Sequence, residues 1–109
     1  MAAVVVLCTA PDSGGTEEMV RTLVEEGVVA CGNIVPDVNS IYRWKGAVEA
    51  AAEALIIFKT TEASWPRLKQ RLTELHPYDV PELLLFKVAD GLPAYLSWVE
   101  ESTAVPDKA

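Results

Sequence analysis

The sequence is poor in the residues on which disulfide frameworks and most metal sites depend, because its 109 residues include only two cysteines and one histidine. Cys8 and Cys31 are too few for a disulfide framework, and a reducing compartment keeps such residues as thiols. No stretch approaches the roughly 20 apolar residues of a membrane span. The apolar start from Ala2 to Leu7 is also shorter than the core of a signal peptide. We therefore expect a cytoplasmic protein with no membrane partner.

Basic residues are scarce as well, since nine Lys and Arg stand against sixteen Asp and Glu and give a net charge of -7. This charge repels a phosphate backbone, so nucleic acid is not an expected partner. The length and the 50% apolar content suit one domain built around one core. We expect a single domain over residues 1–109 with an ordered core of about 3–102, because the tail from Thr103 carries no pattern.

The hydrophobic pattern switches several times between the strand period and the helix period. A β-branched run from Ala3 to Thr9 predicts a buried strand, and the stripe of apolar residues within Thr16 to Glu26 predicts a helix. Two long extended segments follow, with a bulge expected at Pro36-Asp37 and a turn at Lys45-Gly46, although Ala50 to Ala52 favour helix locally. The expected elements are strands at 3–9, 28–44, 48–61 and 82–88, and helices at 16–26, from 64 and from 93.

The second and third helices have clear start signals. Ser64 is a good N-cap, Pro66 is tolerated in a first turn, and Leu68 and Leu72 recur at helical spacing, while Pro93 opens the last helix. The order β-α-β-β-α-β plus a terminal helix is that of the ferredoxin-like motif. The sequence therefore predicts an α+β fold of the ferredoxin-like type, with an additional C-terminal helix and a long central β-hairpin.

The predicted hairpin is longer than two helices can cover, because its strands have about 12 to 15 residues where five or six are usual. An uncovered hairpin with open edges invites aggregation unless another subunit pairs with it. Its end carries Ile41, Tyr42 and Trp44, which a monomer would expose to water. These features predict an oligomer.

Candidate ligands for a metal are few and are far apart in the sequence. Cys8 closes the first predicted strand and His76 follows the second long helix, so a small sheet could bring thiolate and imidazole together, a pair that suits copper or zinc. Each has a plain structural alternative: Cys8 as a small buried hydrophobe and His76 as a helix-terminal residue that complements the macrodipole. The acidic residues near strand ends are more often solvated or salt-bridged than ligands; they are Glu49, Glu53, Glu62 and Glu82.

Catalytic interpretations have little support in the sequence. A Cys–His nucleophile pair needs an orienting third group and an oxyanion hole, and nothing points to either. Gly14 and Gly15 lack the spacing of a phosphate-binding loop and indicate a plain turn. The aromatic residues Tyr78, Tyr95 and Trp98 are interpreted first as packing residues.

Seven stretches taken together resemble the CutA divalent-ion tolerance family, over about residues 3–102. They are Val4-Val5-Val6-Leu7-Cys8-Thr9-Ala10-Pro11-Asp12, Leu23-Val24-Glu25-Glu26, Ala30-Cys31-Gly32-Asn33-Ile34-Val35-Pro36, Ser40-Ile41-Tyr42-Arg43-Trp44-Lys45-Gly46, Lys59-Thr60-Thr61, His76-Pro77-Tyr78-Asp79-Val80-Pro81-Glu82 and Tyr95-Leu96-Ser97-Trp98. The resemblance implies a ferredoxin-like protomer in a tightly packed trimer, similar in outline to the PII signalling trimers. It also implies a link to tolerance of divalent metals, copper above all.

The resemblance implies ligands for a metal as well. In some members, metal binding is ascribed to the cysteine that closes the first strand and to a His pair before Pro-Tyr. Cys8 and His76 match, whereas Leu75 replaces the first His of the pair, so Glu82, water or another subunit would have to complete the site. Gly32 also departs from the family, which usually places a larger residue there.

Together these observations predict a non-enzymatic homotrimer whose inter-subunit clefts bind a small ligand or a divalent cation, copper or another, with no organic cofactor. The metal candidates are Cys8, His76 and Glu82, and the candidates for the interface or cleft are Tyr42, Trp44, Tyr78 and Trp98. The alternative is a PII-like trimeric signalling module that binds a small metabolite or a partner protein in those clefts. A purely structural trimer is a third hypothesis, and an enzyme is the least favoured.

Overall fold

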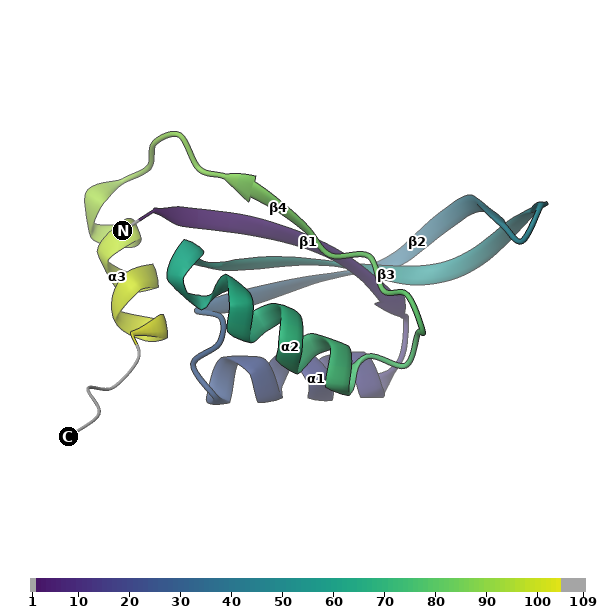
Figure 1. Ribbon diagram of the computed structural model, residues 1–109, viewed down its shortest axis with the longest axis horizontal. Coiled ribbons are helices and arrows are strands. Elements are labelled where there is room, and N and C mark those ends of the chain that lie inside the picture. The colour runs from purple at the N-terminus through teal and green to yellow at the C-terminus, as the bar shows by residue number, and fades with distance from the viewer. Residues whose placement is uncertain (1, 105–109) are drawn as a thin grey trace.

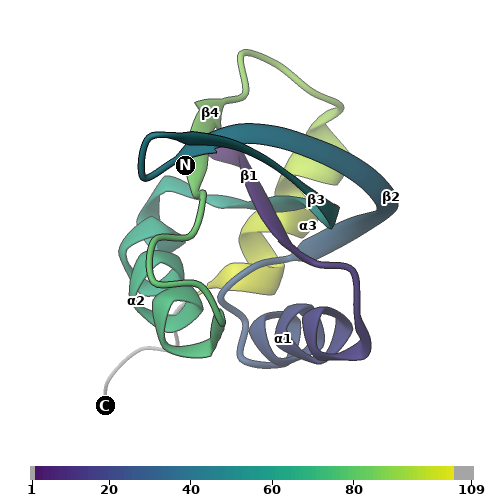
Figure 2. The same ribbon diagram turned by 90° about the vertical axis from the view of Figure 1, so that its right-hand side faces the viewer.

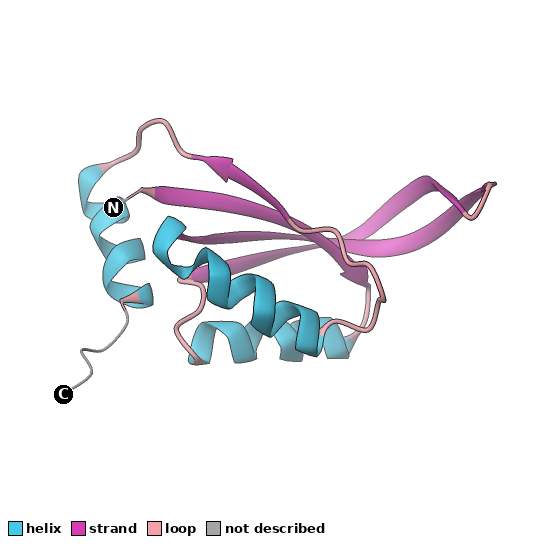
Figure 3. Ribbon diagram, in the orientation of Figure 1, coloured by secondary structure: helices cyan, strands magenta, loops and turns pink. Residues whose placement is uncertain are grey.

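The structure, a computed structural model, describes residues 2–104 and contains four strands and three α-helices (Figures 1 and 3). The elements in chain order are β1 (Ala3–Pro11), α1 (Gly14–Glu25), β2 (Cys31–Trp44), β3 (Ala47–Thr61), the 3-10 turn η1 (Glu62–Ser64), α2 (Trp65–Leu75), β4 (Leu84–Lys87) and α3 (Pro93–Thr103). No helix within residues 2–104 is long and apolar enough to cross a membrane.

The strands form one antiparallel sheet in the order β2-β3-β1-β4, and α1 and α2 lie on one of its faces (Figures 1 and 2). Side chains alternate between buried and less buried along β1, because successive residues of a strand point to opposite faces. The buried set packs against the helices and includes Val4, Val6, Cys8, Ile56, Phe58, Leu23, Leu68 and Leu72. The prediction of a mixed α+β fold is confirmed.

The other face of the sheet is also apolar, although α1 and α2 lie away from it (Figure 2). Leu7 of β1 is directly paired with Ile57 of β3 and with Leu84 of β4, and Val5 is paired with Phe86. Leu84 and Phe86 are 52% and 51% exposed. A half-exposed apolar sheet face of this kind is unusual, because two-layer packing normally buries it.

The hairpin β2–β3 extends well past the helices, as its strands of 14 and 15 residues require (Figure 1). It turns at Lys45 and Gly46, whose φ values of 49° and 82° suit a tight hairpin turn. The register shifts between Val35 and Val38, so the expected bulge is confirmed. Ala50 to Ala52, whose local propensity favours a helix, lie within β3 and are therefore extended.

Three predicted details differ in the structure. Ser64 lies at the N-cap position of α2, but its side chain makes no cap hydrogen bond; its backbone is helical, and the Thr61 hydroxyl accepts the Ser64 N–H at 3.3 Å at the start of η1. The last strand is shorter than predicted, because only Leu84–Lys87 pair with β1. The pattern-free tail begins later than predicted, since α3 includes Thr103, which is buried and donates to the Val99 carbonyl. Residues 105–109 of that tail lie outside the described residues.

Candidate functional site

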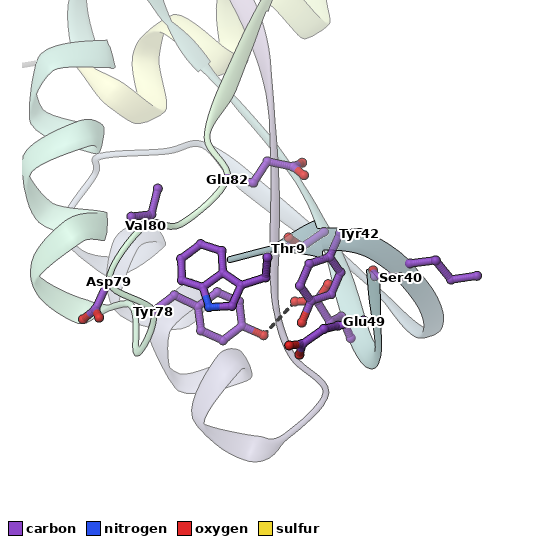
Figure 4. A pocket seen from close by; sticks show the side chains of 11 residues that line it. Thr9, Ser40, Tyr42, Glu49, Tyr78, Asp79, Val80 and Glu82 are labelled. Atoms are coloured by element: carbon purple, nitrogen blue, oxygen red, sulfur yellow. Dashed lines mark hydrogen bonds between the residues drawn. The ribbon is translucent and has the colours of Figure 1, made fainter. Parts of the chain in front are cut away.

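A cavity of about 590 Å³ lies between the hairpin β2–β3 and the loop that joins α2 to β4 (Figure 4). The strands supply one part of its lining and the loop supplies the other. The strand residues are Thr9 of β1, Ser40, Ile41, Tyr42 and Trp44 of β2, and Glu49 and Glu53 of β3; the loop residues are Tyr78, Asp79, Val80 and Glu82. This volume is typical of pockets that bind small organic molecules.

The hairpin register explains which strand residues reach the cavity. Tyr42 is paired with Glu49 across the two strands, and paired residues of an antiparallel ladder point to the same face. Trp44 lies two residues beyond Tyr42, and Glu53 lies four residues beyond Glu49, so the period of two keeps all four on one side. An aromatic and acidic surface is therefore built into one side of the hairpin.

A hydrogen bond between Tyr78 and Glu53 joins the loop to the sheet, and Figure 4 shows it as a dashed line. The Tyr78 hydroxyl donates to Oε2 of Glu53 at 2.6 Å, and Glu53 is only 6% exposed. Burial, together with the hydrogen bond to Glu53 and the charge of that carboxylate, raises the pKa of Tyr78 well above its usual value. The phenol therefore stays protonated and acts as a donor at neutral pH.

His76 fixes the start of the same loop. It is buried, its Nε2 lies 2.8 Å from the Thr9 carbonyl oxygen, and its Nδ1 lies 3.1 Å from the Tyr78 amide nitrogen. Because an amide can only donate, Nδ1 accepts, and Nε2 therefore carries the proton that it donates to Thr9. Both ring nitrogens are thus used to hold the loop against β1.

Cys8 lies next to this contact but is fully buried among core residues. Its thiol donates to the Thr9 carbonyl at 3.5 Å, so Cys8 and His76 both approach the same oxygen. Burial, followed by the charges of Glu82 and Glu53, raises the pKa of the Cys8 thiol from 9.0 to about 12. The thiol is therefore protonated, which also makes it a poor nucleophile.

These observations test whether the predicted ligands fit a divalent cation. A metal requires the thiolate of Cys8 and a free lone pair on His76, whereas the thiol keeps its proton and both imidazole nitrogens are hydrogen-bonded. No group of three or more His, Cys, Asp and Glu side chains within residues 2–104 has an arrangement that could hold a metal ion. Cys8 would have to lose its proton and His76 one of its hydrogen bonds before either could bind a metal, so the assignment of Cys8, His76 and Glu82 stays a prediction.

The predicted cleft residues are separated into two groups. Tyr42, Trp44 and Tyr78 line the cavity together with Glu82, whereas Trp98 lies on α3 against Tyr95, with 5.4 Å between the ring centroids. The cavity also includes Thr9, Ser40, Glu49 and Glu53, whose place in its lining was not predicted from the sequence. The alternation of Tyr42 and Trp44 before a two-residue turn was a usable signal, because it places Glu49 opposite Tyr42.

The chain is similar to known proteins in both sequence and structure. The family model for "CutA1 divalent ion tolerance protein" matches residues 4–102. The chain is 46% identical over 99 residues to the divalent-cation tolerance protein CutA of Thermus thermophilus, covering 91% of this chain and 96% of that protein. It is 40% identical over 101 residues to CutA of Escherichia coli, covering 93% and 90%.

Solved structures give the same result. The Thermus thermophilus divalent cation tolerance protein superposes with a TM-score of 0.90 at 44% identity, covering 94% of this chain and 99% of that one. CutA1 from Oryza sativa superposes with a TM-score of 0.91 at 35% identity, covering 94% of each chain. The chain belongs to the CutA1 family of divalent-ion tolerance proteins.

Proposed function

We propose that the protein serves divalent-cation tolerance in the cytoplasm by binding and not by catalysis, as a homotrimer whose ligand site is the cavity between the hairpin β2–β3 and the loop that joins α2 to β4. The observation that carries this proposal is the cavity itself, with three aromatic rings and four carboxylates in its lining. The protonated Cys8 thiol and the fully bonded His76 ring also support it, because neither is poised for nucleophilic catalysis.

The homotrimer is supported by surfaces that the chain leaves uncovered. The apolar sheet face with Leu84 and Phe86 is half exposed, and at the hairpin end Ile41 and Val48 are 69% and 67% exposed. The order β2-β3-β1-β4 with α1 and α2 on one face supports a ferredoxin-like protomer. Burying the open face and pairing the hairpins between subunits would give the PII-like trimer that the family resemblance implies.

A small ligand suits this cavity better than a bound metal ion does. The volume of about 590 Å³ far exceeds one ion, and no three-donor metal group is present within residues 2–104. This favours the PII-like alternative, in which a small molecule in the cleft modulates the trimer. The metal assignment of Cys8, His76 and Glu82, with copper as the first candidate, stays a prediction.

A thermal-shift screen of small metabolites tests the cavity. We expect some compounds to raise the melting temperature of the parent and not that of Ser40→Phe, because the new ring occupies the cavity that Ser40 lines. Ser97→Phe, at an exposed position of α3, is the matched control and should respond like the parent. Compounds that stabilise the parent and Ser40→Phe equally would place the ligand site elsewhere.

Light scattering over a wide dilution range, with and without one equivalent of copper, tests the assembly and the metal role. We expect a trimer in every sample and equal copper retention by the parent and by Cys8→Ala. A monomer at all concentrations would refute the assembly. Loss of copper in Cys8→Ala alone would instead assign the metal to the predicted Cys8 site.

A further inference from the structure

We infer that the ligand of this cavity is an organic cation, a protonated or quaternary amine with a small apolar body. The inference rests on the proposed function, because it names the chemical class that the same cavity binds. It depends on three observations. They are the negative charge of the lining, the aromatic rings that line the cavity, and the position of the Lys45 ammonium near the Trp44 ring.

The charge of the lining selects for cations. Four carboxylates line the cavity and no Lys, Arg or His side chain does, in a chain whose net charge is -7. Figure 4 shows Tyr42, Glu49 and Tyr78 gathered around the bond to Glu53, whereas Asp79 points away from them. Glu49, which is paired with Tyr42, and Glu53, which is hydrogen-bonded to Tyr78, are therefore carboxylates that lie beside the rings. Phosphorylated or carboxylated metabolites would be repelled by this lining.

The aromatic rings of the lining can also bind an amine, in addition to the carboxylates. Tyr42, Trp44 and Tyr78 line the cavity and remain 41%, 44% and 36% exposed. The faces of such rings attract a cation within about 6 Å of the centroid, most strongly for Trp. Because Tyr78 is held by Glu53 and its loop is held by His76, one of the three rings is already in place before a ligand arrives.

An ammonium group of the chain itself already lies near one of these rings. Nζ of Lys45, at the hairpin turn, lies 5.8 Å from the centroid of the Trp44 ring. Glu49, which is exposed and faces Tyr42 across the strands, makes no ion pair within the described residues. A ligand with an ammonium group would compete with Lys45 for the ring and would gain the carboxylate of Glu49.

Three probes of similar size and different charge test the inference on the full-length protein in its native assembly. They are 2-phenylethylamine, 2-phenylethanol and phenylacetate, titrated by NMR while the ring signals of Tyr42, Trp44 and Tyr78 are followed. We expect the amine to bind about tenfold more tightly than the alcohol, because it adds a charge-assisted hydrogen bond, and we expect phenylacetate not to bind. An alcohol or carboxylate that binds these rings as well as the amine would overturn the inference and leave the cavity proposal standing.

Charge variants provide the matched controls. Glu49→Gln should weaken amine binding about fivefold, and Lys45→Gln should strengthen it about twofold by removing the competing ammonium. Glu18→Gln removes the same charge from an exposed position of α1 and should leave binding unchanged. If Glu49→Gln and Glu18→Gln weaken amine binding equally, the affinity depends only on the net charge of the protein, and the proposed site is refuted. If none of the probes binds, the amine inference falls, and the Ser40→Phe screen decides separately whether the cavity proposal falls with it.

Discussion

Removal of one oxygen atom, in Tyr78→Phe, should destabilise the protein because it leaves a buried carboxylate without its donor. Glu53 is 6% exposed and accepts the Tyr78 hydroxyl at 2.6 Å, the one hydrogen bond that the described residues show for its carboxylate. The phenylalanine ring would keep the packing of Tyr78 against His76, whose ring centroid lies 4.7 Å away. The substitution therefore isolates the hydrogen bond from the ring contact.

The expected cost follows from the charge and the burial of the acceptor. A hydrogen bond to a charged group contributes about 1.5–3 kcal/mol, and a buried acceptor left unpaired costs about 1–3 kcal/mol. Tyr78 itself is 36% exposed, so water can replace part of the lost bond. We expect a loss of about 2 kcal/mol in the free energy of unfolding, which is roughly a thirtyfold change in the folding equilibrium.

Urea denaturation of the parent and of Tyr78→Phe at the same protein concentration measures this difference, since the stability of an oligomer depends on concentration. Tyr95→Phe is the control, because Tyr95 is similarly exposed at 43% and its hydroxyl makes no hydrogen bond to a described residue. A loss below about 0.5 kcal/mol, equal to that of Tyr95→Phe, would refute the reasoning. It would mean that Glu53 finds water or another donor at no cost.

Two further predictions concern the core. Gly32→Ala should lower the free energy of unfolding by about 1–3 kcal/mol, because a Cβ at this position would lie 2.5 Å from Cγ1 of Val20. Adding Val20→Ala to the same chain removes that methyl group and should recover most of the loss. Thermal denaturation of the single and double variants measures both effects. Burial raises the pKa of Cys8 from 9.0 to about 12, so the folded state holds this proton longer than the unfolded state and stability should fall as pH rises from about 9 to 12. Denaturation midpoints against pH should therefore be flatter in Cys8→Ala, and a thiol reagent should modify Cys31 but not Cys8 in the native protein.

Most of the fold could be predicted because its signals are local. The bulge at Pro36-Asp37, the turn at Lys45-Gly46 and the two long strands depend on neighbouring residues, and the structure confirms them. The missing cap bond of Ser64 could not be predicted in this way, because the Ser64 hydroxyl donates to the Thr103 carbonyl, 39 residues away, and the Thr61 hydroxyl accepts the Ser64 N–H at the start of η1. A propensity rule ranks residue types and does not include such distant partners.

The cavity was harder to predict for the same reason. It depends on the register that places Glu49 opposite Tyr42, and on a loop that returns to β1 through His76. The aromatic residues were recognised, but Glu53 was interpreted as a solvated or salt-bridged side chain, although it is among the most buried charged residues that the structure describes. Nothing in the sequence around Glu53 shows that Tyr78, 25 positions away, supplies its hydrogen bond.

The substitution of Leu75 for a family histidine has a consistent physical interpretation in this chain. Leu75 packs against the core at the end of α2, and His76, the residue after it, uses both ring nitrogens to fasten the loop to Thr9 and Tyr78. An imidazole that carried a metal would have to release one of these bonds and loosen the wall of the cavity. His76 is therefore an anchor of the loop that lines the cavity, and metal binding through its ring would require this contact to open.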